Sequence, residues 1–199
     1  MVTSTVNRIR RNHGLEHATI HVLSESHKRF SAQGNSDHRG FHLNIYGDVS
    51  EAEVAAAVAE AHRRLRAGER QLAVHPNCGT VLVTTAMLAT AAAQAVFSFE
   101  QWREGTPDGK GAGRRWLTAA NALPGATLAV VAALIVGRPL GLTLQERYTV
   151  DGNIADLEVV SVRPVPVSPV ARLFQLLLTA GNRALPPKSY FVRTAGGEA

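Results

Sequence analysis

The sequence is poor in cysteine and has no concentration of charge of one sign. Its single cysteine, Cys78, excludes a disulfide within the chain, so nothing indicates an oxidising compartment. The net charge is +5, but the basic excess is thin and spread along the chain, which argues against a nucleic-acid partner. The first twelve residues hold no apolar segment of a cleavable secretory signal, so a protein facing the cytoplasm is expected.

Two long runs, residues 79–99 and 116–137, contain no charged residue. Each reaches the roughly 20 residues that a helix needs to cross about 30 Å of hydrocarbon. Trp102 and Trp116 lie near the run ends, where interfacial aromatic residues are expected, and residues 105–113 form a polar turn. We therefore predict a transmembrane helical hairpin. The alternative is a soluble core with two buried helices, because the first run is rich in Ala and Thr.

Basic residues beside the two runs indicate how the hairpin is oriented, because they favour the cytoplasmic side. The side that holds both termini carries more of them (Arg63, Arg64, Arg66, Arg70, Arg138 and Arg147) than the connecting loop (Arg103, Lys110, Arg114 and Arg115). Both termini are therefore expected in the cytoplasm, with the lipid bilayer as a partner.

Residues 5–27 are expected to form a helix, because apolar side chains recur at steps of three and four. The same stripe continues through His13, Glu16 and His17. Ionisable groups thus occupy the face that should be buried. Burying them without partners costs several kcal/mol, so something must satisfy them.

His13, Glu16 and His17 form a His-x-x-Glu-His motif, the inverted order of the zincin motif. Two imidazoles at i and i+4 lie one helical turn apart and can share one metal. Glu16 could take a proton from a metal-bound water, whose pKa zinc lowers towards about 7. His75 and Cys78, at the start of the first apolar run, could supply the third ligand, and the dipole of that helix favours the Cys78 thiolate.

Each of these residues also has an ordinary structural explanation. His13 and His17 could be core histidines held by Glu16 and backbone carbonyls, and Cys78 could be a small buried residue. The set favours a metal, with zinc expected and another divalent ion as the alternative, because several ionisable groups on one buried face need a shared partner. His21 is expected to lie next to the metal ligands and not to bind the metal itself. The remaining histidines are expected to be solvated or structural: His27, His38, His42 and His62.

The expected fold class is α+β. A small N-terminal α/β segment packs on the transmembrane hairpin and is followed by a short β-hairpin and a C-terminal amphipathic helix. We divide the chain into a metal-site region (1–78), the hairpin (79–137) and a cytoplasmic region (138–199). The expected strands are 41–46, 71–74, 144–150 and 157–162, and the expected further helices are 51–67, opened by a Ser50–Glu53 capping box, and 170–182.

The strings HGLEHATI, from His13, and HPNCGT, from His75, precede the apolar hairpin. This arrangement resembles a bacterial membrane family of unknown function described as predicted metal-dependent enzymes, whose pattern is HGAEHK followed by HPRCGT. The similarity covers about residues 13–162. The chain lacks the Gly-rich N-terminal segment of that family and looks like a shorter, related subgroup. The resemblance implies metal dependence at His13, Glu16, His17, His75 and Cys78.

Three functions fit these features. The leading hypothesis is a membrane-anchored zinc-dependent hydrolase that acts at the cytoplasmic interface on a peptide or a lipid-linked substrate. The second is a non-enzymatic adaptor for membrane proteins, with a structural metal site closed by His13, His17, His75 and Cys78, since four protein ligands leave no open position. The third makes Cys78 a nucleophile activated by His75 or His17.

Overall fold

The computed structural model describes residues 2–28, 30–104, 112–154, 156–169, 171–173 and 187–196. The chain forms two compact units. The first, which we call the α+β unit, comprises Met1–His75 and Glu146–Ala199. The second, the hairpin unit, comprises Pro76–Gln145. The chain therefore leaves the α+β unit after His75 and returns to it at Glu146.

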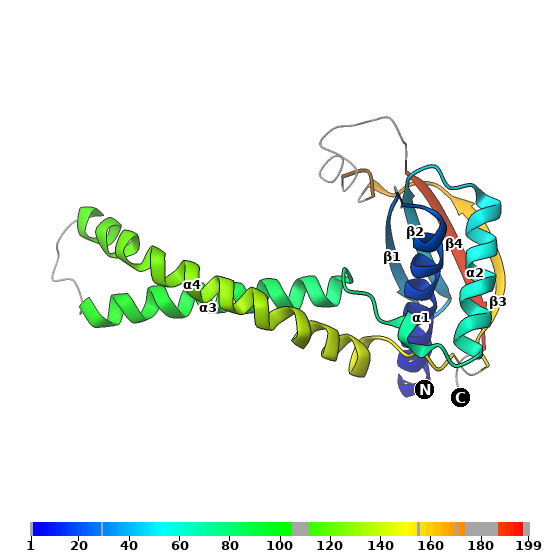
Figure 1. The fold of residues 1–199 in the computed structure, drawn as a ribbon, viewed down its shortest axis with the longest axis horizontal. Helices are drawn as coiled ribbons and strands as arrows, with labels where there is room; N and C mark the ends of the chain where they lie inside the picture. Colours follow the sequence, from blue (N-terminus) through cyan, green and yellow to red (C-terminus); the bar gives the residue numbers. More distant parts are fainter. Residues whose placement is uncertain are drawn as a thin grey trace. The chain divides into compact units, whose positions relative to one another are not determined.

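The α+β unit is built on a four-stranded antiparallel sheet of order β1-β2-β4-β3. The strands are β1 (Ser31–Asp37), β2 (Gly40–Tyr46), β3 (Glu158–Val165) and β4 (Lys188–Ala195). Helices α1 (Val2–Ser26) and α2 (Glu51–Arg66) cover one face of this sheet (Figure 1). The mixed helix and sheet content confirms the predicted α+β class.

The core of this unit lies between the sheet and the two helices. Alternate residues of β2, Phe41 and Leu43, are fully buried, whereas His42 between them is exposed, as the period of two in a strand requires. They share a hydrophobic cluster with Leu15 of α1 and Val58 of α2. Burying each such side chain contributes roughly 1.5–3 kcal/mol. This packing fixes α1, and with it the His-x-x-Glu-His motif, against the sheet.

Two buried polar contacts set the position of α1 on the sheet. The Asn12 side-chain amide, which is fully buried, donates to the backbone carbonyl of Asp37 at 2.7 Å. Its Oδ1 accepts from the Thr194 hydroxyl, also at 2.7 Å. Because an unpaired buried amide costs about 1–3 kcal/mol, these bonds join α1 to β1 and β4 in one arrangement.

The segment before α2 holds two strands where the sequence predicted one. The structure confirms a strand at residues 41–46, but β1 pairs with it throughout, with Ser36 opposite Phe41. Asp37 makes the turn, because its Oδ1 accepts from the backbone N–H groups of Arg39 (2.6 Å) and Gly40 (3.1 Å). β1 was missed because its sequence, SAQGNSD, has no apolar alternation.

The strand predicted at 157–162 is confirmed as β3, but two other strand predictions and one pairing are wrong. Residues Arg70–Ala73 form a 3-10 helix, not the strand predicted at 71–74, with the Leu72 N–H donating to Glu69 at 3.1 Å. The strand predicted at 144–150 is the end of a helix followed by a π-helical turn, Gln145–Thr149. The predicted hairpin of 144–150 with 157–162 is therefore wrong as well. β3 instead pairs with β4, which the sequence analysis did not identify.

The predicted start of α2 is confirmed. Ser50 is the N-cap, its hydroxyl accepts from the Glu53 N–H, and the Glu53 carboxylate accepts from the Ser50 N–H at 2.8 Å. The Ser50 hydroxyl also donates to the Glu53 carboxylate at 2.6 Å, and this bond, followed by the one from the Ser50 N–H, holds the pKa of Glu53 below its usual value. The helix thus begins at the residue that the capping box indicates.

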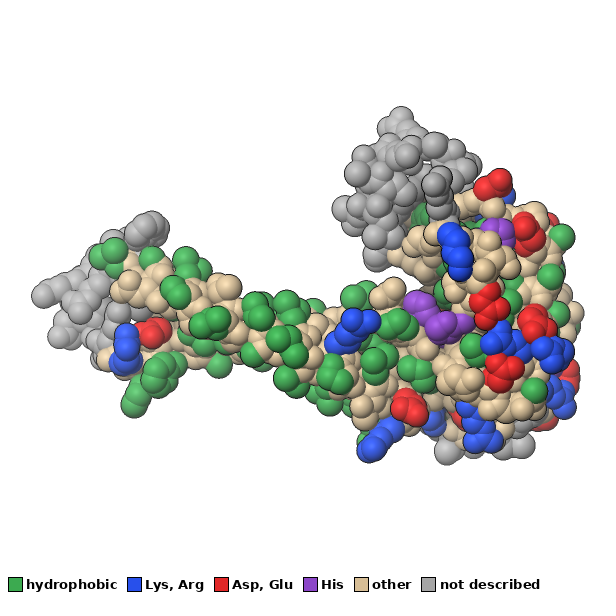
Figure 2. Space-filling view, in the orientation of Figure 1, with side chains coloured by type: hydrophobic (Ala, Val, Ile, Leu, Met, Phe, Trp, Pro, Cys, Tyr) green, Lys and Arg blue, Asp and Glu red, His purple; other side chains and the backbone are tan. Residues whose placement is uncertain are grey.

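The hairpin unit consists of α3 (Gly79–Glu104) and α4 (Ala112–Leu144). The two helices approach closely at glycines, since a Cβ added at Gly141 would lie 2.8 Å from the Val81 Cα and one at Gly137 3.0 Å from the Thr85 Cα. Hydrophobic side chains lie along the visible surface of this unit, among other side chains and a few charged ones (Figure 2). Two helical stretches, Gly79–Arg103 and Ala119–Thr149, are long and apolar enough to cross a membrane.

Two sequence predictions fall largely outside the described residues. The polar turn predicted at 105–113 includes 105–111, and the amphipathic helix predicted at 170–182 has only residues 171–173 described. The side chain of Trp116 is also outside the description.

Candidate metal centre

Helix α1 places His13 and His17 one turn apart on the same side. Their rings are in edge contact, with centroids 4.4 Å apart and an interplanar angle of 60°. His17 is buried and His13 is half-buried. The i, i+4 spacing predicted from the sequence therefore brings two imidazoles within the reach of one ion.

Backbone carbonyls hold both of these rings by the same nitrogen. His17 Nδ1 lies 2.7 Å from the Ala73 oxygen, and His13 Nδ1 lies 2.9 Å from the Thr149 oxygen. A carbonyl oxygen only accepts, so in both rings Nδ1 carries the proton and donates it. Nε2 is then the nitrogen that can bind a metal, and a carbonyl on the opposite nitrogen is the usual way in which proteins orient a metal-binding histidine.

His75 lies beside the same row of rings. Its centroid is 5.7 Å from that of His17 and 5.0 Å from that of His21. His21 Nε2 donates to the Val74 carbonyl at 3.0 Å, so two successive carbonyls, of Ala73 and Val74, accept from histidines of α1. Those bonds align the end of the 3-10 helix with α1 and place His75 among the rings.

The environment of His75 favours its neutral form. Burial, followed by the nearby His21 and His17, lowers its pKa to about 4. His75 is therefore neutral at physiological pH, and the neutral imidazole is the form that ligates metals. The rings of His13 and His17 are in contact and His75 lies beside His17, and imidazole nitrogen is a ligand that zinc takes.

Glu16 lies on the side of α1 that faces β1. It is only 3% exposed, its Oε2 accepts from the Ser36 hydroxyl at 2.6 Å, and its carboxylate fills the space above Gly34, where any Cβ would overlap it. These contacts on β1 were not foreseen, because residues 31–37 lack the alternation of a strand and were not predicted to pack against α1. They show what holds the Glu16 carboxylate in place.

Cys78 belongs to the hairpin unit and precedes α3, where its carbonyl accepts from the Leu82 N–H at 3.1 Å. Its side chain is buried. Since Cys78 follows His75 by three residues, their Cα atoms lie at most about 11 Å apart by covalent geometry. Its ligation of a metal stays a prediction from the sequence.

Three other histidines have structural contacts. His62 Nε2 lies 2.7 Å from the Leu157 carbonyl and joins α2 to the segment before β3, and His27 lies 3.4 Å from the Glu53 carboxylate. His42, on the exposed side of β2, stacks at a tilt on Phe191 of β4, with ring centroids 4.7 Å apart. The sequence does not indicate the Ser36 hydroxyl or the carbonyls of Ala73, Val74 and Thr149 as parts of the site. The carbonyls carry no sequence signal because any residue supplies one.

Comparison with known proteins gives a family but no activity. The family model described as a domain of unknown function (DUF6391) matches residues 8–162. An uncharacterised protein of the cyanobacterium Picosynechococcus sp. is 38% identical over 94 residues, which cover 43% of this chain and 45% of that protein. The matched segment thus spans less than half of its relative. No solved structure matches the chain. The family of unknown function expected from the two motifs is confirmed at that level, and the chain belongs to the DUF6391 family.

Proposed function

We propose that this protein is a membrane-anchored, zinc-dependent hydrolase whose site is built on α1. His13 and His17 bind the ion in this proposal, and His75 and Cys78 are the candidates for the third ligand. The observation that carries the proposal is the shared orientation of His13 and His17, each of which donates from Nδ1 to a backbone carbonyl. With Nδ1 held by a carbonyl in both rings, Nε2 is in each the nitrogen suited to a metal.

Zinc, when bound, supplies a Lewis acid that makes water a nucleophile at neutral pH. Glu16 is the proton acceptor in this proposal. The hydrogen bond from the Ser36 hydroxyl holds this carboxylate in place. The chain's own contribution is therefore to fix two imidazoles by carbonyls and one carboxylate by a hydroxyl before any substrate arrives.

The membrane anchor in this proposal is the hairpin unit, because its helices expose large apolar side chains along their length. The basic residues on the terminal side favour a cytoplasmic α+β unit. A substrate at the membrane interface follows, either a peptide or a lipid-linked molecule. Extraction of membranes with alkaline carbonate tests the anchor, and the full chain should stay in the pellet. Recovery in the soluble fraction without detergent would contradict the anchor and leave the metal site unaffected.

The metal site is tested by measuring zinc in the full chain purified in detergent. The wild type should carry about one zinc ion per chain, and His17→Ala should lose it. The matched control is His42→Ala, which removes an exposed imidazole from the other side of the sheet and should retain zinc. Zinc content that is equal in the two variants would contradict the site.

A substitution at Glu16 distinguishes the hydrolase from a non-enzymatic adaptor. Glu16→Gln keeps the shape and the Ser36 contact but not the basicity, so it should retain zinc and fold while abolishing the cellular function of the chain. Glu60→Gln, at an exposed carboxylate of α2 paired with Arg63, is the control and should keep function. The measurement is complementation of a deletion strain together with metal content.

The second candidate is a non-enzymatic membrane adaptor with a structural metal site. It is favoured by the burial of Glu16 between α1 and β1, which suits a carboxylate that only orients its surroundings. In that case Glu16→Gln complements fully, with metal affinity lowered by about 10–100-fold at most. Full complementation would therefore replace the hydrolase by the adaptor.

A further inference from the structure

We propose that His21 and His75 form an outer metal-binding pair through which zinc reaches, and leaves, the site of His13 and His17. The inference rests on the zinc site proposed above and concerns how that site is loaded. His21 then has a role of its own, because it is not a ligand of the fully loaded site.

The four rings form a continuous row in the order His13, His17, His75 and His21. The centroid distances along it are 4.4, 5.7 and 5.0 Å. Two imidazoles that share a tetrahedral zinc at about 2.0–2.1 Å from each nitrogen hold their centroids roughly 5 Å apart. Each neighbouring pair is thus near the spacing at which it can share an ion after small ring rotations.

Burial differs along this row. His17 is 3% exposed, whereas His75 and His21 are half-buried. His13 is half-buried too, but its one neighbour in the row is the buried His17. An ion arriving from water therefore meets two adjacent, partly solvated imidazoles only at the end formed by His21 and His75.

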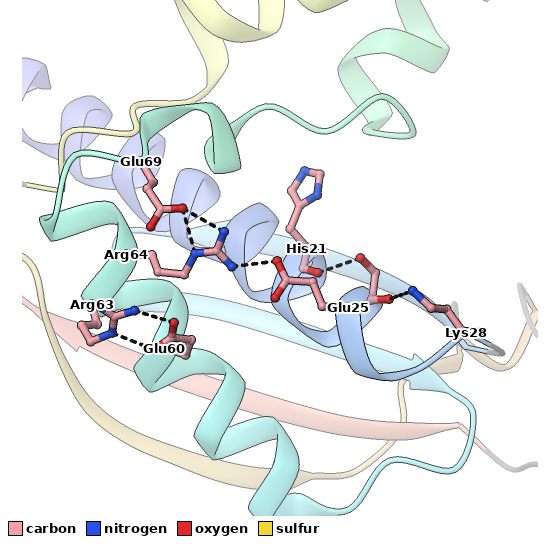
Figure 3. Close-up of polar contacts among 8 residues, drawn as sticks. His21, Glu25, Lys28, Glu60, Arg63, Arg64 and Glu69 are labelled. Atoms are coloured by element: carbon pink, nitrogen blue, oxygen red, sulfur yellow. Dashed lines mark hydrogen bonds and ion pairs between the residues drawn. The ribbon is translucent and has the colours of Figure 1, made fainter.

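The carboxylates near His21 are committed elsewhere. Glu25 and Glu69 both pair with the Arg64 guanidinium, at 2.7 and 2.8 Å, and the ring of His21 points away from this group of charges (Figure 3). The contact that fixes His21 is the hydrogen bond from Nε2 to the Val74 carbonyl, so its Nδ1 is the nitrogen suited to an ion. Its environment is that of a metal-binding imidazole, with one nitrogen held by a carbonyl.

His75 is the shared member of the two pairs. It can keep hold of an ion while its partner changes from His21 to His17, so the ion always has at least one imidazole ligand. Because His21 binds the ion only on the way, it lowers the barrier to loading and to release equally. Its removal should slow both steps and leave the dissociation constant unchanged.

The experiment measures zinc binding and release by stopped flow, using the metal-free full chain in detergent and a fluorescent zinc chelator as competitor. In His21→Gln, the association and dissociation rate constants should each fall about tenfold, which is about 1.4 kcal/mol on each barrier, with an unchanged Kd. His21→Cys, which restores a metal-binding side chain, should recover most of both rates. His42→Gln is the control and should behave as the wild type.

Several results would overturn the outer pair. Unchanged rates in His21→Gln would show that zinc does not pass His21, and a weaker Kd with an unchanged association rate would make His21 a ligand of the loaded site. Two zinc ions per wild-type chain, one of them lost in His21→Gln, would make the pair a stable second site instead. A wild type that binds no zinc overturns the zinc site itself. Should His21→Gln fail to fold, His21→Asn gives the same comparison.

Discussion

The α+β unit and the hairpin unit place their large apolar side chains in opposite ways. In the first, Phe41, Leu43 and Val192 are 0% exposed and pack between the sheet and two helices. In the second, Leu128 is 72% and Ile135 70% exposed, on helices that approach each other closely at Gly137 and Gly141. A unit that faces water must bury such side chains, whereas helices in hydrocarbon, the environment proposed for the hairpin unit, need only pack closely enough to exclude lipid between them.

Glycine makes the same difference visible. Gly40 opens β2 with φ +148°, directly against the Val192 carbonyl of the neighbouring strand. Gly141 is in a regular helix and is needed only because α3 lies so close. Strand pairing therefore requires the glycine in the α+β unit, and the close approach of two helices requires it in the hairpin unit. Substitution of either glycine should destabilise only its own unit.

The largest effect is expected for Gly40→Ala. The new Cβ would overlap the Val192 carbonyl and the residue would keep a strained φ, so we expect a loss of about 3 kcal/mol or more in the stability of the α+β unit. Hydrogen exchange followed by mass spectrometry should show faster exchange of β2 and β4 amides and unchanged α3 and α4. Gly68→Ala is the control, because Gly68 has φ +98° and no atom lies within 4 Å of the new Cβ. It introduces backbone strain without a steric overlap and should lower the stability of the α+β unit by about 1 kcal/mol. Equal deprotection of both units would show that they unfold together.

A smaller effect is expected in the hairpin for Gly141→Ile. Its Cβ would lie 2.8 Å from the Val81 Cα, so the helices must separate, at a cost of about 1–3 kcal/mol. Amides of α3 and α4 should exchange faster in detergent, while those of the sheet keep their rates. Ala132→Ile adds the same side chain at an exposed position of α4 and should change neither unit. An equal response to the two substitutions would contradict glycine-mediated packing.

The smallest effect concerns the start of α2 and depends on pH. Ser50→Ala should cost about 1 kcal/mol at neutral pH. Because the hydrogen bonds from Ser50 lower the pKa of Glu53, the stability linked to them is present above the usual glutamate pKa and is lost as the pH falls through the lowered value. Unfolding of wild type and variant by urea between pH 7 and pH 3 should thus show a shrinking difference. A difference that stays constant would mean that Glu53 takes no part in the cap.

The sequence predicted the parts of this protein that depend on neighbouring residues. The capping box located the start of α2, the charge-free runs located α3 and α4, and the i, i+4 spacing placed His13 and His17 on one side of α1. All of these follow from helical periodicity or from chemistry within one turn, which acts over a few residues.

Tertiary structure alone decided the rest. The polar segment Ser31–Asp37 becomes a strand only because β2 and α1 lie beside it, and β3 pairs with β4 across a long stretch of chain instead of with the segment before it. The carbonyls of Ala73 and Thr149 fix the tautomers of two histidines from 56 and 136 residues away. Such partners are chosen by the burial of the whole core, because a backbone hydrogen bond has no side-chain identity that a sequence can display.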